Sequence, residues 1–461
     1  MRKGEYYKVD KIITGLLEDA ITEIENLQDY YNAQKKYVNK YVKDNIRKYK
    51  YGIILDRFFV KKILDLKEIK ISELEKKVID DIVADYSIEP KDGGFIISYK
   101  LNPEKDFSGY EMDPQIAKDN FSKLIQYPSI LNNSMIMMLL VKYEEAISGI
   151  YKYLLEAFPQ AYLSDKSITY SELVSYESDI KEIKKRFIDK EIEEFMRCPL
   201  SEWYKSFESK QKAKFYYETM EFEKFKEIYY RRNLIVHNQG VINEVYKKNI
   251  LNSDGEIGEH LEVNNEYLKQ AFLVTKKILI GTVWGLRKTA DDIEELNSYL
   301  SEYGYACLKN KKWNLAEYIY SMLLKDEKQR NVAKMCQQVN YWIAVKNKKG
   351  IKEIEDSVKK LDVTAMKSQF VVAKYALLDE FEKVSESLES AIINEIPAWC
   401  VKEWPLFNQY RKSEQYRKFV EKHKELFETI EYEPNNETIG EREDIINELG
   451  KDIDVTLELD N

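Results

Sequence analysis

Residues Met135–Phe158, with the sequence MIMMLLVKYEEAISGIYKYLLEAF, decide the fold class of this chain. Gly149 is the only helix-weakening residue in the stretch, Ser134 is a suitable N-cap, and Pro159 follows the last residue. We therefore expect a long and strongly apolar helix at this point.

The composition extends this prediction to the whole chain of 461 residues. Its 16 glycines and 9 prolines make up about 5% of the residues, whereas these two types average roughly 12% in proteins. So few turn-forming residues disfavour a β-sandwich or a β-barrel. A charged fraction of 33% and a hydrophobic fraction of 44% suit amphipathic helices, and 13% aromatic residues exclude wholesale disorder. The sequence predicts a mostly all-α protein with several domains.

No segment has the features of a secretion signal or a membrane span. Residues 1–8 contain no apolar core. The longest apolar run, Met135–Val141, has seven residues, whereas a span needs about 20. The cysteines stand far apart and have no neighbouring histidines, which argues against a zinc site or a disulfide framework. We expect a cytoplasmic protein that contacts no membrane and uses no metal or cofactor. The four cysteines are Cys198, Cys307, Cys336 and Cys400.

The net charge of −9 belongs to one end of the chain. The protein has 72 Lys and Arg residues and 81 Asp and Glu residues, but residues 431–461 alone contain eleven acids and two bases. The body of the chain is therefore balanced, and the total charge does not argue against a nucleic-acid substrate. This acidic C-terminal tail is either a solvated, disordered segment or a phosphate mimic that covers a basic RNA cleft.

Residues 1–107 are expected to form a small α+β N-terminal region. Ile12–Ile24 has helical spacing, Ile53–Leu64 is apolar enough for a core segment, and Ile71–Tyr86 reads as a charged helix. Phe95–Tyr99, after a glycine-rich turn, is the clearest strand or hairpin candidate. We find no chemistry in this region.

Residues 108–291 are expected to form a helical domain. A loop rich in Pro, Asn and Ser, residues 102–133, leads into the long helix, and more helices are expected at about 170–197, 202–230 and 266–290.

The sequence pattern of residues 292–430 is typical of short helices arranged in pairs. Trp313, Ala316, Tyr320 and Leu323 are matched at the same spacing, 68 residues later, by Phe381, Val384, Leu388 and Ala391. This offset is twice the tetratricopeptide period of 34 residues. A shorter signal, Lys309–Lys312 before Trp313, recurs as Lys346–Lys349 before Gly350, where a second turn is expected. The pattern favours an α-solenoid of tetratricopeptide-like helix pairs with a concave surface for a protein or small-ligand partner. An irregular helical bundle is the alternative.

The residues that carry chemistry lie in Tyr229–Gly240, YYRRNLIVHNQG. Asn233 and His237 are four residues apart and share a helix face, and the long side chain of Arg232 flanks them. Gly240 is expected to stop the helix and leave the imidazole near solvent. The other two histidines, His260 and His423, are interpreted as solvated surface groups.

This set of residues suits RNA cleavage without a metal. A histidine can take a proton from the ribose 2′-hydroxyl or give one to the leaving 5′-oxygen. An arginine offers a planar pair of donors to the phosphate, and Asn233 can orient the imidazole or bind the phosphate. A helix C-terminus favours the protonated imidazole, which suits an acid role for His237. In the alternative interpretation, His237 caps the end of the helix, Arg232 forms a surface ion pair, and the site catalyses no reaction.

The segment Arg232-Asn233-Leu234-Ile235-Val236-His237-Asn238, followed by Gly240 and Asn243, resembles the signature of the HEPN superfamily. That signature is an arginine, a polar residue and a histidine a few residues later. The upstream helix Met135–Pro159 resembles the long helix before the motif in many bacterial members. The resemblance covers about residues 120–290.

The resemblance implies a HEPN-type helical bundle that forms a homodimer and acts as a metal-independent endoribonuclease in toxin, abortive-infection or other anti-phage systems. It places the catalytic groups at Arg232, Asn233 and His237, and we assign Arg231 and Asn238 to substrate binding. RNA would be cleaved by 2′-hydroxyl attack to a 2′,3′-cyclic phosphate. Some members are inactive, so a non-catalytic scaffold that assembles partner proteins is the alternative. A further possibility is regulation by nucleotidylation of Tyr246.

Overall fold

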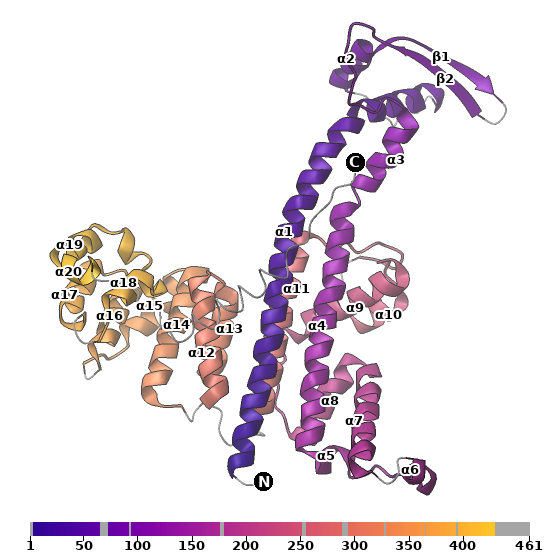
Figure 1. The fold of residues 1–461 in the computed structure, drawn as a ribbon. Coiled ribbons are helices and arrows are strands. Elements are labelled where there is room, and N and C mark those ends of the chain that lie inside the picture. The colour runs from indigo at the N-terminus through magenta and orange to yellow at the C-terminus, as the bar shows by residue number, and fades with distance from the viewer. Residues whose placement is uncertain are drawn as a thin grey trace, which may run out of the picture. The chain divides into compact units, whose positions relative to one another are not determined.

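The computed structural model describes residues 3–64, 72–91, 94–175, 179–250, 255–287, 294–326, 329–364, 366–392 and 395–428. The acidic C-terminal tail, residues 431–461, lies outside these ranges. The chain divides into two compact units, residues 1–299 and 300–461. The described residues are predominantly helical and contain one two-stranded sheet (Figure 1), which confirms the predicted mostly all-α class.

Unit 1 contains a long N-terminal helix, a hairpin and a bundle of helices. In chain order its elements are α1 Lys3–Leu64, α2 Glu73–Ile82, β1 Val83–Lys91, β2 Gly94–Leu101, α3 Pro114–Leu124, α4 Tyr127–Ala157, α5 Pro159–Leu163, α6 Tyr170–Ser175, α7 Ile180–Arg197, α8 Leu200–Gln211, α9 Phe222–Asn238, α10 Glu244–Asn249 and α11 Asn265–Leu286.

The core of unit 1 is built around α4 and α11. Helix α4 packs against α1, α7, α9 and α11, and α11 also packs against α1 and α9 (Figure 1). Most residues of α11 from Leu268 onward are buried, including every residue from Ile278 to Leu286, which matches its apolar sequence. Tyr31 of α1 donates to Asn132 of α4 at 2.9 Å, and Asn132 donates to the Val263 carbonyl at 2.8 Å. These buried hydrogen bonds fix α1, α4 and the segment before α11 relative to one another.

One helical stretch among the described residues, Pro114–Ala157, is long and apolar enough by composition to cross a membrane. The longest uninterrupted apolar run, Met135–Val141, is too short to have indicated a candidate membrane span here. Within unit 1 its second part, α4, is a core helix, because side chains such as Leu139, Leu140 and Ile147 are buried against neighbouring helices.

The hairpin confirms the predicted strand at Phe95–Tyr99. Strands β1 and β2 pair antiparallel with Ile88 opposite Ile97. The expected helix Ile71–Tyr86 is shorter, because the chain leaves α2 at Ile82 and continues as β1. Ser72 and Glu75 form a capping box at the start of α2.

The loop expected at residues 102–133 contains the whole of α3 and the start of α4. Asp113 accepts hydrogen bonds from the next helical N–H groups, and Pro114 occupies the first helical position, so the local signal for α3 was present in the sequence. Helix α4 begins at Tyr127, so Ser134 lies inside it and is not its N-cap.

The expected helix 202–230 is divided into α8 and α9. Lys212, after the end of α8, and Glu221, before the start of α9, have left-handed conformations.

Unit 2 begins within a helix and consists of short helices joined by tight turns (Figure 1). Its elements, with the helix that leads into it, are α12 Glu294–Lys309, α13 Trp313–Leu323, α14 Asn331–Lys349, α15 Lys352–Lys359, α16 Ser368–Leu377, α17 Phe381–Ala391, α18 Ala398–Glu403, the 3₁₀ helices η2 Pro405–Phe407 and η3 Tyr410–Lys412, α19 Glu414–Lys422 and α20 Lys424–Glu428.

The two segments matched at 68 residues have the same local structure. Helices α13 and α17 each contain 11 residues. Each follows a left-handed residue two positions earlier, Lys311 with φ 58° and Asp379 with φ 58°. Gly304 lies where an added Cβ would be 3.0 Å from the Tyr320 ring, so a small residue is required there. The turn expected at Lys346–Lys349 is instead the last turn of α14, with Gly350 as its C-cap.

Candidate functional site

The predicted catalytic residues lie on the last two turns of α9, and the end of this helix is firmly defined. The backbone N–H groups of Gln239 and Gly240 both donate to the Leu234 carbonyl. Gln239 has φ 54° and Gly240 has φ 78°, so both adopt the left-handed conformation that ends a helix. The buried side chain of Leu234 packs with Ile242, Tyr246 and Ile250 and anchors this end of α9.

His237 lies in the last turn of α9 and its side chain is exposed. Asn233, one turn earlier, is half-buried, and neither side chain has a hydrogen bond within the part of the chain that the structure describes. The two side chains share a helix face because they are four residues apart. An imidazole and an amide are therefore both available to a ligand at this end of the helix.

Arg232 faces a different direction and is already paired. Five residues along an α-helix correspond to about 140° of net rotation, so Arg232 and His237 leave α9 from different sides. The Arg232 guanidinium forms an ion pair with Glu144 of α4, and its Cζ lies 5.0 Å from the centre of the Tyr229 ring. Its Nε atom is buried and has no hydrogen-bond partner among the described residues. A phosphate would have to share this guanidinium with Glu144 or displace the carboxylate.

Arg231 is part of a partly buried network. Its Nε donates to Glu227 at 2.7 Å, its Nη1 donates to the Glu262 carbonyl at 3.0 Å, and its Cζ lies 4.0 Å from the centre of the Tyr267 ring. Glu227 also accepts from the hydroxyls of Tyr246 and Tyr267, each at 2.7 Å. The network links α9, α10 and α11 and holds the start of the motif, around Arg231, in a fixed position.

Tyr246 is buried, with 1% of its surface exposed, and its hydroxyl is bound to Glu227. Burial, followed by the nearby Glu227 charge, raises the pKa of Tyr246 well above its ordinary value. Nucleotidylation of this hydroxyl would therefore require local opening of α10.

His260 is exposed, as expected for a surface group, but its position beside the end of α9 was not predicted from the sequence. Val241 and His260 form an isolated antiparallel bridge, and the Leu261 N–H donates to the Gly240 carbonyl at 2.9 Å. An added Cβ on Gly240 would lie 2.9 Å from Nε2 of His260, so the exposed imidazole covers the glycine that ends α9. No local pattern indicated this position, because the bridge joins segments about twenty residues apart. The Asn238 amide donates to the Val241 carbonyl at 2.6 Å and supports the same turn.

Unit 2 has a cavity of about 290 Å³ near its tight turns. Lys346 lines it and is ion-paired with Asp379 at 2.6 Å, and Asn347 and Asn408 add polar groups. This arrangement of charged and amide groups could hold a small polar ligand.

Comparisons with known protein families, with curated proteins and with solved structures found no match to this chain. No group of three or more His, Cys, Asp or Glu side chains within the described ranges could hold a metal ion.

Proposed function

We propose that this protein is a metal-independent endoribonuclease of the HEPN type that acts in the cytoplasm. The observation that supports this proposal most is the placement of Asn233 and the exposed His237 on the final turns of α9, with Arg232 on the same helix. His237 would transfer a proton to or from the ribose, and Arg232 would stabilise the negative charge that develops on the phosphate. The products would be a 2′,3′-cyclic phosphate and a free 5′-hydroxyl.

The active form in this proposal is a homodimer. Arg232 and His237 leave α9 in different directions, and one imidazole cannot easily serve as both base and acid in one step. A second copy related by twofold symmetry would bring two copies of the motif to one cleft. The predicted biological role is that of a toxin or an anti-phage effector, regulated by a protein or ligand bound to the tetratricopeptide-like helices of unit 2.

The test compares total-RNA cleavage by wild type, His237→Ala, Arg232→Ala and Asn233→Ala in the presence of a metal chelator. We expect cleavage to fall by about 100-fold or more in the His237 and Arg232 variants, because general acid–base catalysis and charge stabilisation each contribute at least this much. His423→Ala is the matched control, because His423 lies in unit 2 and binds Glu389 at 2.9 Å. Fragments should end in 2′,3′-cyclic phosphate. Equal cleavage by wild type and His237→Ala would contradict the proposal.

The ion pair between Arg232 and Glu144 specifically favours a second candidate, a non-catalytic scaffold. In that case Arg232 joins α9 to α4 and has no chemical role. Wild type that cleaves no RNA, while Arg232→Ala unfolds at a lower temperature, would support the scaffold.

A further inference from the structure

The middle of α1 has an unusual surface for a helix in a bundle. Burial in α1 stops at Tyr31 and resumes at Gly52, and between them no side chain is buried. A stretch of five helical turns is therefore exposed or half-exposed. It is supported by α3 and α4, which pack against α1. Core packing does not explain which residues occupy this stretch.

Tyrosine rings are arranged in a row on this surface. Tyr37 is 66% exposed and Tyr41 is 42% exposed. Their ring centroids are 6.3 Å apart with an interplanar angle of 20°. The Tyr41 ring lies in turn 6.2 Å from that of Tyr127, which is 39% exposed and begins α4. Tyr30, 54% exposed, precedes Tyr37 by seven residues and so lies on the same helix face.

The same part of α1 is rich in bases, and these bases have no acidic partners among the described residues. Residues 35–50 contain seven bases and one acid, Asp44. Within the described ranges none of the seven bases forms an ion pair, although Lys and Arg elsewhere in the chain are paired repeatedly, as at Lys142 and Lys166. The seven bases are Lys35, Lys36, Lys40, Lys43, Arg47, Lys48 and Lys50.

We propose that this surface, Tyr37, Tyr41 and Tyr127 with the bases of residues 35–50, binds single-stranded nucleic acid. Unpaired bases can stack on the exposed tyrosine rings, and phosphates of the same strand can contact the unpaired lysines. A duplex hides its base faces and leaves the rings without a partner. The lack of buried residues in this part of α1 means that the surface can be altered without disturbing the core.

The test uses fluorescence anisotropy with labelled 20-mers of oligo(U) and oligo(dT) and a duplex of the same length. All variants are made in the full chain that carries His237→Ala, so that no substrate is cut. We expect Tyr37→Ala/Tyr41→Ala to weaken single-strand binding by about tenfold for each ring, and Tyr37→Phe/Tyr41→Phe to preserve binding, because the phenyl ring still stacks. Tyr170→Ala, at a tyrosine that is 80% exposed on α6, is the matched control.

A second pair of variants tests the charge. Lys36→Glu/Lys40→Glu should weaken binding and reduce the slope of log affinity against log salt by about 1.4, because each phosphate contact on a single strand contributes about 0.7. Lys205→Glu/Lys269→Glu makes the same change in net charge at exposed, ion-paired lysines elsewhere in unit 1 and should bind as the parent does.

Three results would overturn the proposal: no binding of either single strand, equal binding of the duplex, or equal binding by the parent and the Tyr37→Ala/Tyr41→Ala variant. Binding of anionic lipid vesicles that depends on the same tyrosines would also overturn it in favour of a membrane surface. The comparison of oligo(U) with oligo(dT) decides between RNA and DNA. The proposal is independent of cleavage, since binding without any nuclease activity would contradict only the proposed function.

Discussion

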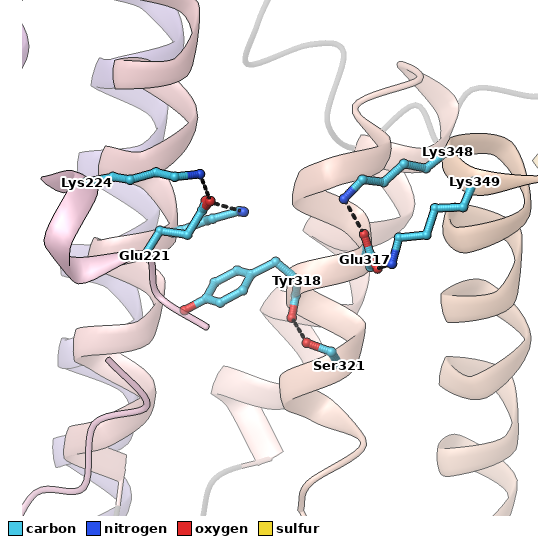
Figure 2. Close-up of polar contacts among 8 residues, drawn as sticks. Glu221, Lys224, Glu317, Tyr318, Ser321, Lys348 and Lys349 are labelled. Atoms are coloured by element: carbon cyan, nitrogen blue, oxygen red, sulfur yellow. Dashed lines mark hydrogen bonds and ion pairs between the residues drawn. The ribbon is translucent and has the colours of Figure 1, made fainter. Parts of the chain in front are cut away.

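At the scale of single residues, carboxylates held by two lysines are a recurring feature (Figure 2). In unit 1, Glu221 accepts from Lys224 and from Lys277 at 2.6 Å. In unit 2, Glu317 accepts from Lys348 at 2.7 Å and from Lys349 at 2.9 Å. Partial burial raises the pKa of Glu317, but the two lysine hydrogen bonds outweigh this and leave the pKa below its ordinary value.

A lowered pKa in the folded state has a defined consequence for stability. The Glu317 carboxylate stabilises the fold above its unfolded-state pKa, and this contribution is lost as the pH falls through the lower, folded-state pKa. We expect Glu317→Gln to have a lower Tm than wild type at pH 7, with a difference that shrinks below about pH 4. Thermal unfolding followed by circular dichroism from pH 3 to 7 measures this. Glu266→Gln, at an exposed pair with Lys269, should change little. A pH-independent difference would contradict the explanation.

At the scale of elements, the end of α9 determines where His237 lies. Gly240 is suited to this position for two separate reasons, its positive φ of 78° and its closeness to the His260 ring. A side chain at Gly240 would be strained by the backbone conformation and would also meet the imidazole.

We expect Gly240→Ala to destabilise unit 1 by about 1–2 kcal/mol, from the left-handed backbone and the displaced imidazole together. Gly258→Ala separates the two causes, because Gly258 has φ 94° but has no atom within 4 Å of an added Cβ. In urea unfolding, Gly258→Ala should lower the free energy of unfolding by less than Gly240→Ala does. Adding His260→Ala to Gly240→Ala should restore the part of the unfolding free energy by which Gly240→Ala is less stable than Gly258→Ala. If Gly240→Ala and Gly258→Ala lower the unfolding free energy equally, then His260 does not contribute.

At the scale of the whole molecule, charge is divided unevenly. Residues 431–461 contain eleven acids and two bases, and residues 35–50 contain seven bases and one acid. If the acidic tail competes with nucleic acid, then a chain that ends at Tyr432 should bind oligo(U) more tightly and cleave RNA faster than the full chain. The effect should be largest at low salt, because the competition is electrostatic. Equal binding and cleavage by both chains across a salt titration would show that the tail is only a solvated extension.

The sequence predicted the elements with strong local signals. The apolar run around Leu139 and Leu140, the glycine at Gly240 and the paired segments at Trp313 and Phe381 are all helix features that act within a few residues. Helix α3 was missed because Pro and Asn in residues 102–133 were read as loop formers, although Asp113-Pro114 is also a helix start. The break between α8 and α9 was missed because the left-handed residues there, Lys212 and Glu221, are not glycines.

Local sequence patterns were enough to predict the mostly helical class of this protein, the end of α9 and the position of Arg232, Asn233 and His237 on that helix. Capping and hydrophobic spacing act between near neighbours, so they can be read along the chain. In contrast, the pairing of Arg232 with Glu144, 88 residues away, and the contact of His260 with Gly240 are visible only in the folded chain. These contacts depend on how helices and loops pack. A local sequence pattern therefore does not specify which carboxylate or ring lies next to a given residue.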